Sequence, residues 1–195
     1  MSTAATSSTP PFGRFDSWAP ALERLDLLPD PVAEALRGWA DRAAAESVLF
    51  VDTDPAKADT AAFAEAYGVP LDCGANCVVV AAKRGQETTL AGCLVRADTR
   101  LDVNKVVRKR LGARKASFAP MDTAVQETGM EYGGITPIGL PADWPLLVDE
   151  AVAETAHVLI GSGRRRGKLI LPGAAVAQLP GVEVVSGLAA PVPAA

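Results

Sequence analysis

The sequence predicts an α+β domain with a mixed β-sheet, and two observations support this prediction. Several apolar runs of strand length are interspersed with segments of helical periodicity, without the regular spacing of βαβ units. In addition, 49% of the 195 residues are hydrophobic and 22% are charged, so the chain can bury a core of its own. We expect a single domain over residues 47–190, an N-terminal helical arm over 17–46 and a disordered tail over 1–16.

The N-terminal arm is predicted to contain two amphipathic helices. Ser17 can cap a first helix that runs to Leu28. Asp30 and Pro31 then begin a second helix, which the spacing of apolar residues continues to about Glu46. Two interpretations stay open, because the apolar stripe of the arm can pack on its own domain or bind a partner.

The first half of the main domain is predicted to contain a strand, a helix and a β-hairpin. Ser47–Val51 is an apolar run typical of a strand, and an alanine-rich helix begins at Asp54 and ends at Gly68. Cys77–Ala82 and Leu90–Arg96 are strands separated by a short polar turn, which predicts a hairpin.

A basic amphipathic helix follows the hairpin. Asp102 caps the segment Val103–Leu111, whose valines face inward. Its outward face is formed by Lys105, Arg108, Lys109 and Arg110.

The second half is predicted to contain short elements only. Ala116–Phe118 is a strand, and a small helix is capped by Asp122 and ended by Gly129. A further short helix is expected at Pro172–Leu179. The remaining strands are expected at Leu146–Asp149, Val158–Ile160, Lys168–Leu171 and Val182–Val185.

The stretch Tyr132–Gly139 contains three glycines and one proline, which excludes a helix interior. Gly133 and Gly134 can adopt positive φ, and Pro137 fixes the far side of the loop. Its N–H groups can form a concave cluster that suits an oxyanion, a carboxylate or a phosphate. The alternative is a tight connection between two strands.

The net charge of −4 conceals an asymmetry along the chain. Residues 1–82 contain 5 Lys or Arg against 12 Asp or Glu, whereas residues 83–115 contain 10 Lys or Arg against 3 acidic residues. A second basic cluster follows at 164–168. Two interpretations stay open: a basic face that binds a polyanion, or ordinary solvated surface.

The side chains that most often bind metals do not form a recognisable site, so we expect no metal and no cofactor. Cys73, Cys77, Cys93 and the single histidine, His157, lack the closely spaced cysteine pairs of structural zinc sites. Three cysteines cannot all pair, which favours a reducing compartment. With no signal-peptide pattern at residues 1–11 and no apolar run of membrane-spanning length, we expect a cytoplasmic protein without a membrane partner.

Two short motifs resemble a known family. Thr128 and Gly129, followed by Gly133–Gly139, are similar to its motif Thr-Gly…Gly-Gly-Ile-Ser-Pro-Leu-Gly. Ile160–Gly163 with Arg166 and Gly167 resembles its strand end Val-Ser-Gly-Gly-Lys-Arg-Gly.

The basic helix and the order of the motifs extend this resemblance. Asp102–Leu111 with the turn Gly112–Ala116 resembles the basic helix of the same family. Together the motifs cover about residues 66–185. They resemble the YbaK/EbsC family, the standalone relatives of the editing domain inserted in bacterial prolyl-tRNA synthetases.

The resemblance implies a fold and an activity. The fold is a mixed, barrel-like β-sheet flanked by helices. The activity is that of a trans-editing hydrolase, which deacylates mischarged aminoacyl-tRNA by cleaving the ester at the tRNA 3′ end. The attacking group is a water, helped by the free hydroxyl of the terminal ribose. The implied partner is aminoacyl-tRNA, with an aminoacyl-tRNA synthetase as a further candidate and no DNA.

The resemblance also implies roles for individual residues, with the loop Gly133–Pro137 presenting N–H groups around the aminoacyl group. The expected catalytic residues are Asn76, Gly133 and Gly134, and the expected substrate-binding residues are Ile135, Thr136, Pro137, Ser162 and Gly163. Phosphate contacts are expected from Lys105, Arg108, Lys109, Arg110, Arg164, Arg165, Arg166 and Lys168.

One position departs from the family pattern. The family's active-site lysine lies at the start of the strand that here begins at Gly74, and alignment of the apolar run places Asn76 in that position. An asparagine forms hydrogen bonds but has no charge with which to neutralise an oxyanion or a phosphate. Two hypotheses follow: an enzyme with a modified site, or a non-catalytic module that binds an aminoacyl or nucleotide-like ligand or tRNA.

Overall fold

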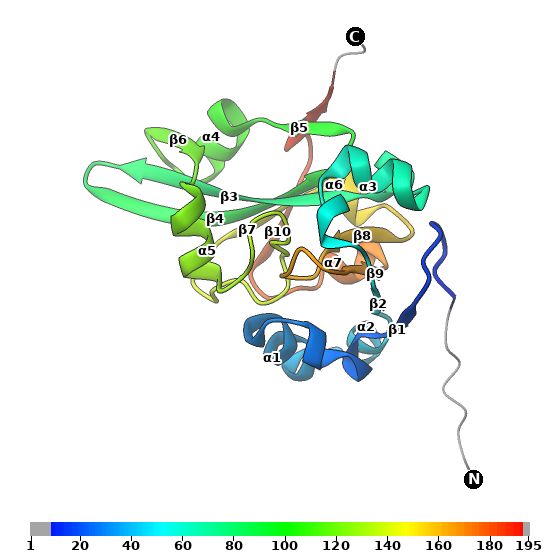
Figure 1. The fold of residues 1–195 in the computed structure, drawn as a ribbon. Helices are drawn as coiled ribbons and strands as arrows, with labels where there is room; N and C mark the ends of the chain where they lie inside the picture. The colour runs from blue at the N-terminus through cyan, green and yellow to red at the C-terminus, as the bar shows by residue number, and fades with distance from the viewer. Residues whose placement is uncertain (1–8, 193–195) are drawn as a thin grey trace.

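A long β-hairpin forms the centre of the larger sheet in the computed structural model, which describes residues 9–192 (Figure 1). Strands β3 (Ala75–Arg84) and β4 (Glu87–Arg96) pair antiparallel over their whole length. Gly85 lies in the turn with a φ of 65°, a conformation that glycine adopts without strain. The hairpin predicted from the sequence is confirmed, and both strands extend further than expected.

Three further strands complete a five-stranded sheet in the order β10-β7-β4-β3-β6. Strands β7 and β10 run parallel to their neighbours, whereas β6 is antiparallel to β3. The sheet is therefore mixed, which confirms the predicted α+β class. The added strands are β6 (Lys115–Phe118), β7 (Leu146–Asp149) and β10 (Val182–Val185).

A second, antiparallel sheet has the order β1-β2-β9-β8, and two short strands form a third. Within residues 9–192 none of the three sheets closes on itself, so the expected barrel-like closure is wrong. The two larger sheets are joined by an isolated parallel bridge between Gly74 and Leu159, which does not extend into a ladder. The strands are β1 (Trp18–Pro20), β2 (Leu49–Val51), β8 (Val158–Gly161), β9 (Lys168–Leu171), β5 (Thr99–Leu101) and β11 (Ala189–Pro191).

Short helices surround the sheets. The α-helices are α1 (Asp30–Gly38), α2 (Arg42–Glu46), α3 (Thr60–Tyr67), α4 (Arg108–Arg110), α5 (Met121–Thr128), α6 (Glu150–Ala153) and α7 (Gly173–Val176). Short 3₁₀ turns occur at Ala21–Glu23, Leu25–Leu27, Pro55–Lys57 and Leu71–Cys73, and a π-helical turn occurs at Val103–Val107. None of the helices in the described part of the chain is both long and apolar enough to span a membrane.

The core consists of layers on both sides of each sheet. The largest layer lies between the two larger sheets and includes Leu94, Val148, Ile160 and Leu169. The far face of the five-stranded sheet packs on the π-helical turn, and the far face of the four-stranded sheet packs on α3. Each larger sheet thus has buried side chains on both faces, although the edge strands β6 and β10 are largely exposed.

The N-terminal arm differs from the expectation. The helix expected at residues 17–28 is wrong, because Trp18–Pro20 forms β1 and pairs with the edge of β2, after which come two 3₁₀ turns. The second helix ends at Gly38, since Trp39 is extended, and Asp41 then caps the separate helix α2.

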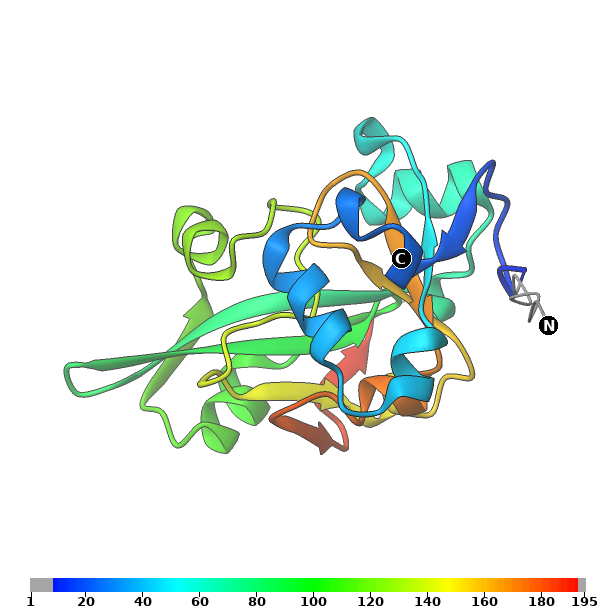
Figure 2. The ribbon, with the colours of Figure 1, turned by 90° about the horizontal axis from the view of Figure 1, so that it is seen from below.

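The apolar side of α1 packs on its own domain. Val32 and Leu36 are fully buried in the layer between the sheets. Figures 1 and 2 show α1 on one side of the hairpin, opposite α4. Of the tail expected at residues 1–16, residues 1–8 lie outside the described residues, and Phe15 is buried against the rings of α3.

The start of α3 was predicted wrongly, because Asp54 caps the 3₁₀ turn Pro55–Lys57 and α3 begins only at Thr60. The ends of the helices were predicted well. Gly68 and Gly129 end α3 and α5 in the left-handed conformation, and Asp102 accepts a hydrogen bond from Lys105 N at 2.9 Å. The cap of α5 is Pro120 rather than Asp122, which lies in the first turn. Strands β5 and β11 and helix α6 were not predicted, because each has only three or four residues and no periodic pattern.

Candidate functional site

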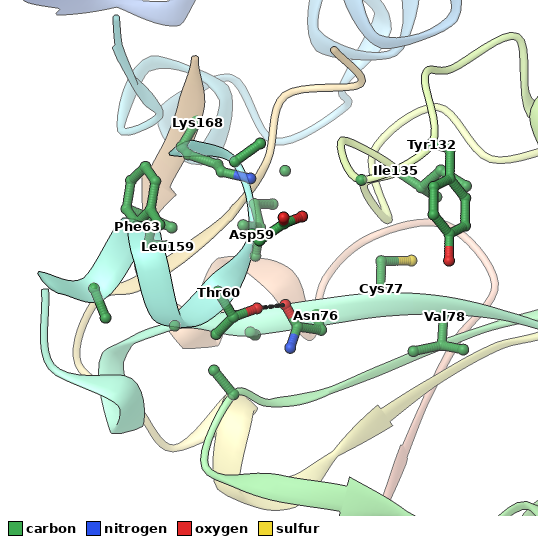
Figure 3. A pocket seen from close by; sticks show the side chains of 18 of the residues that line it. Asp59, Thr60, Phe63, Asn76, Cys77, Val78, Tyr132, Ile135, Leu159 and Lys168 are labelled. Carbon is green, nitrogen blue, oxygen red and sulfur yellow. Dashed lines mark hydrogen bonds between the residues drawn. The ribbon is translucent and has the colours of Figure 1, made fainter. Parts of the chain in front are cut away.

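A cavity of about 650 Å³ opens where α3, the first half of β3 and the glycine loop meet (Figure 3). Its wall is formed by residues far apart in the sequence, which the sheet order brings together. These include Asp59, Thr60, Phe63, Asn76, Cys77, Val78, Tyr132, Gly133, Ile135, Leu159, Gly161 and Lys168.

Asn76 lines the cavity at the start of β3. Its side chain is exposed, and its Oδ1 atom accepts a hydrogen bond of 3.4 Å from Thr60 Oγ1 at the start of α3. The two side chains therefore form a polar patch on one wall, with an amide and a hydroxyl group that can bind a polar ligand. Thr60 was not identified from the sequence, since only the fold places α3 beside β3.

The glycine loop forms the other wall, and its backbone is bound to the end of β8. Gly134 N donates to Glu131 O at 2.9 Å, and Gly163 N donates to Gly134 O at 2.7 Å. A Cβ atom on Gly134 would lie 2.3 Å from Arg164 O, so only glycine fits there. The N–H of Gly134 is thus used within the loop and does not face a ligand.

The predicted loop and strand-end residues separate into two groups. Gly133 and Ile135 line the cavity. The others lie behind it: Gly134, Thr136, Pro137, Ser162 and Gly163 are buried. The Ser162 hydroxyl accepts from Arg164 N at 3.3 Å and lies 3.0 Å from Arg166 O, so it shapes the turn before β9.

Lys168 is not on the basic surface where the sequence predicted it. It is 8% exposed and lines the cavity, with Nζ 5.5 Å from the centre of the Phe63 ring. Side chains alternate along a strand, so Lys168 lies on the same face of β9 as Ile170, which packs with Phe63. The basic sequence Arg164–Lys168 concealed this alternation.

The environment of Lys168 destabilises its charge. Burial lowers the pKa of Lys168 to about 8, and the nearby Arg165 adds to this effect, whereas Asp59 opposes it. Among residues 9–192 no carboxylate lies within 4.0 Å of the Lys168 ammonium. The amine is therefore largely protonated at neutral pH without a direct counter-ion.

The three arginines that precede Lys168 are engaged within the protein. Arg166 forms two hydrogen bonds with Asp52, of 2.8 and 2.7 Å, and holds the pKa of that carboxyl below its usual range. Arg165 lies 3.8 Å from Asp59, and Arg164 donates to Leu28 O. These contacts limit the freedom of the cluster to bind another molecule.

The predicted basic helix keeps its charges at the surface. Lys105, Arg108, Lys109 and Arg110 are all exposed. Arg108 Nε donates to Asn104 O at 2.8 Å, and Arg110 forms an ion pair with Glu183. This helix lies on the face of the five-stranded sheet that is turned away from the four-stranded sheet.

The mouth of the cavity is apolar and exposed. The exposed fractions of Phe118, Met121 and Tyr132 are 60%, 52% and 59%. Large apolar side chains that stay in water on one rim are typical of a surface that binds a flat or apolar group.

The cysteines do not offer a nucleophile or a metal site. Burial raises the pKa of the Cys77 thiol strongly and that of Cys93 to about 12, so both stay protonated at neutral pH. No three His, Cys, Asp or Glu side chains come close enough to hold a metal ion anywhere in residues 9–192.

Residues 54–179 match the model of the aminoacyl-tRNA editing domain family. The match covers more than half of the chain and includes both walls of the cavity. The chain therefore belongs to this family, which confirms the resemblance found in the sequence.

Related proteins agree with this assignment. The chain is 31% identical over 132 residues to the proline–tRNA ligase of Burkholderia multivorans (strain ATCC 17616 / 249), which covers 67% of this chain and 22% of that protein. The identity is 30% with the enzyme of Burkholderia cenocepacia (strain HI2424), over the same shares of both proteins. The chain thus spans about a fifth of the length of these relatives.

Solved structures share the fold. A candidate trans-editing enzyme for prolyl tRNA synthetase aligns with a TM-score of 0.66 at 20% identity, covering 80% of this chain and 96% of that one. A hypothetical protein aligns with a TM-score of 0.69 at 19% identity, covering 80% and 99%.

Proposed function

We propose that this protein hydrolyses the ester bond of mischarged aminoacyl-tRNA in trans. The observation that carries the proposal is the cavity, which lies within the residues matched by the editing family. Its volume of about 650 Å³ is in the range of small-molecule sites and suits the aminoacylated end of a tRNA. Such an activity belongs to translation and therefore to the cytoplasm.

The chemistry of the wall fits an attack by water. The protonated Cys77 thiol is a poor nucleophile. The backbone of Gly133 and Ile135 forms one side of the site, and the hydroxyl and amide of Thr60 and Asn76 form the other. Polar groups held in place around a carbonyl stabilise the charge that develops on it during hydrolysis.

The surface around the cavity suggests how the tRNA is held. Tyr132 and Phe118 at the mouth are placed to stack on the terminal bases, an interaction typical of single-stranded nucleic acid binding. Lys105 and Lys109 are free to contact phosphates of the acceptor stem. Association with an aminoacyl-tRNA synthetase belongs to the same proposal.

A non-catalytic binding module is the alternative, and it rests on Asn76, which has no charge. The structure weakens this reason, because Lys168 brings a positive charge into the same cavity.

The test is the release of amino acids from a panel of mischarged tRNAs, measured with enzyme in excess. Thr60→Trp fills the cavity from an exposed position, so the release should fall at least tenfold while the fold is kept. Thr88→Trp, an exposed threonine at the far end of β4, is the matched control and should behave as the wild type. Binding of every tRNA without any release would refute the activity.

A further inference from the structure

Lys168 is a buried positive charge for which residues 9–192 offer no carboxylate within 4.0 Å. An ammonium on a residue that is only 8% exposed keeps part of its water shell at most, and this partial burial costs free energy unless an anion compensates it. Its closest described aromatic contact is the ring of Phe63, which offers only a weak attraction. The carboxylate that acts on Lys168 is shared with another group, since Asp59 lies 3.8 Å from Arg165.

The position of Lys168 relates it to the glycine loop. Its Cα pairs with that of Gly161 on β8, and a Cβ on Gly161 would lie 2.3 Å from Gly134 O. Strand β8 thus lies between the backbone of Lys168 on β9 and the glycine loop, which forms the opposite wall. Figure 3 shows its amine pointing into the cavity, on the side of Asp59.

The charge of a bound substrate limits what Lys168 can contact. An aminoacyl ester has a positive α-ammonium group and a neutral carbonyl, so neither offers a full negative charge. A negative charge appears inside the cavity only when water adds to the carbonyl carbon. The terminal phosphate also has a negative charge, but it belongs to the backbone of the tRNA outside the aminoacyl group.

We infer that Lys168 is a catalytic residue that stabilises the oxyanion formed when water adds to the ester carbonyl. This inference rests on the proposed deacylase function. It takes a place that no residue of the recognised motifs fills, because Asn76 has no charge and Gly134 N–H is already bound. The positive charge in the cavity is therefore supplied by a lysine on β9, whereas β3 supplies the uncharged Asn76.

The step is balanced without a cofactor. The oxygen of a water molecule forms a bond to the carbonyl carbon, and the carbonyl π electrons move to its oxygen, which accepts a hydrogen bond from the Lys168 ammonium. The intermediate then collapses with cleavage of the bond to the ribose oxygen. The proton lost by the water ends on that ribose oxygen, and the products are the free amino acid and the tRNA.

Rates and affinities of matched variants test the inference. Removal of one oxyanion donor typically lowers a rate about 10²- to 10³-fold. Lys168→Gln should therefore lower the single-turnover release rate about a hundredfold, with the tRNA dissociation constant within threefold of wild type. Lys168→Arg keeps the charge and should retain more activity. Lys83→Gln removes an exposed lysine at the far end of β3 and is the control.

The pH profile gives a second readout. The charged groups that face Lys168 are Asp59 at the start of α3 and Arg165 in the turn before β9. The protonated amine is the active form, so the enzymatic rate, corrected for spontaneous hydrolysis, should decline above about pH 8. Lys168→Arg should lack this decline. A wild-type rate that instead rises through pH 8 by a Lys168-dependent step would overturn the inference.

An inert analogue separates this inference from the proposed function. An aminoacyl phosphonate ester of adenosine has the negative charge of the intermediate, and adenosine 5′-phosphate has that of the backbone. Lys168→Gln should weaken phosphonate binding at least tenfold and leave adenosine 5′-phosphate binding unchanged. If the wild type releases amino acids but Lys168→Gln is equally fast, only the role of Lys168 fails. If the wild type deacylates no tRNA, the proposed function is refuted. The catalytic role of Lys168 is then refuted as well, even if Lys168 still binds the anionic analogue.

Discussion

The two walls of the cavity are built in different ways. The glycine-loop wall is held by backbone hydrogen bonds, such as that from Gly163 N to Gly134 O, and leaves no room for a side chain at Gly134. The opposite wall consists of side chains on α3, β3 and β9, including Thr60, Asn76 and Lys168. The difference teaches that the recognisable motif mainly supplies the frame, whereas the polar and charged side chains of the cavity come from positions outside it.

The largest effect is expected from the loop wall. Gly134→Ala would push a Cβ atom against Arg164 O, so we expect a loss of about 3 kcal/mol or more in the free energy of unfolding. Gly38→Ala is the control, because nothing lies within 4 Å of its Cβ, and it should be neutral or slightly stabilising. Urea denaturation measures both. An unchanged midpoint for Gly134→Ala would contradict the close contact between loop and turn.

The second effect is a gain in the free energy of unfolding, which we expect when Lys168 is replaced. Its folded-state pKa of about 8 lies below the ordinary value of 10.5, so the unfolded chain binds more protons between these two pH values. The stability of the wild type should therefore rise from pH 8 to pH 10.5 relative to Lys168→Met.

At pH 7, Lys168→Met should accordingly increase the free energy of unfolding by about 2–3 kcal/mol, since one pKa unit corresponds to about 1.4 kcal/mol. The same variant should lose deacylation. Denaturant titrations at pH 7 and pH 10, with the variant beside the wild type, measure the difference. If the difference in the free energy of unfolding between Lys168→Met and the wild type were the same at pH 7 and pH 10, Lys168 would not be held in an environment that destabilises its charge.

The smallest effect concerns the affinity for tRNA and compares two basic groups outside the cavity. The affinity for tRNA should fall as salt rises, and each lost phosphate contact should reduce the slope of log K against log salt by about 1. Lys109→Gln should show this reduction, because Lys109 is exposed on the basic helix. Arg166→Gln should change the slope less, since Arg166 already binds Asp52. Equal slopes for the two variants would mean that Arg166 exchanges partners when tRNA binds.

The sequence predicted those parts of the fold that depend on local patterns. The hairpin, β7 to β10 and the glycine ends of α3 and α5 follow from periodicity and from the conformational freedom of glycine. Strand β1 could not be predicted in this way. Its residues form a strand because the edge of β2 is available, and that edge is supplied by residues about thirty positions later.

The candidate site shows the same limit. Asn76, Gly133 and Ile135 were identified from the sequence and do line the cavity, but their roles stay predictions. Thr60 and Lys168 were missed as cavity residues. A threonine at a helix start and a lysine after three arginines look like surface residues until the register of β9 and the place of α3 are known.

The close contact between Gly134 and Gly161 has a consequence for how this protein can change. Because no side chain fits between the loop and β8, neither position can accept a substitution without moving the backbone. Amino-acid preference must then adapt through the other wall, at positions such as Thr60, Asn76 and Val78. Variation among natural and engineered forms with different substrates should accordingly concentrate on α3 and β3.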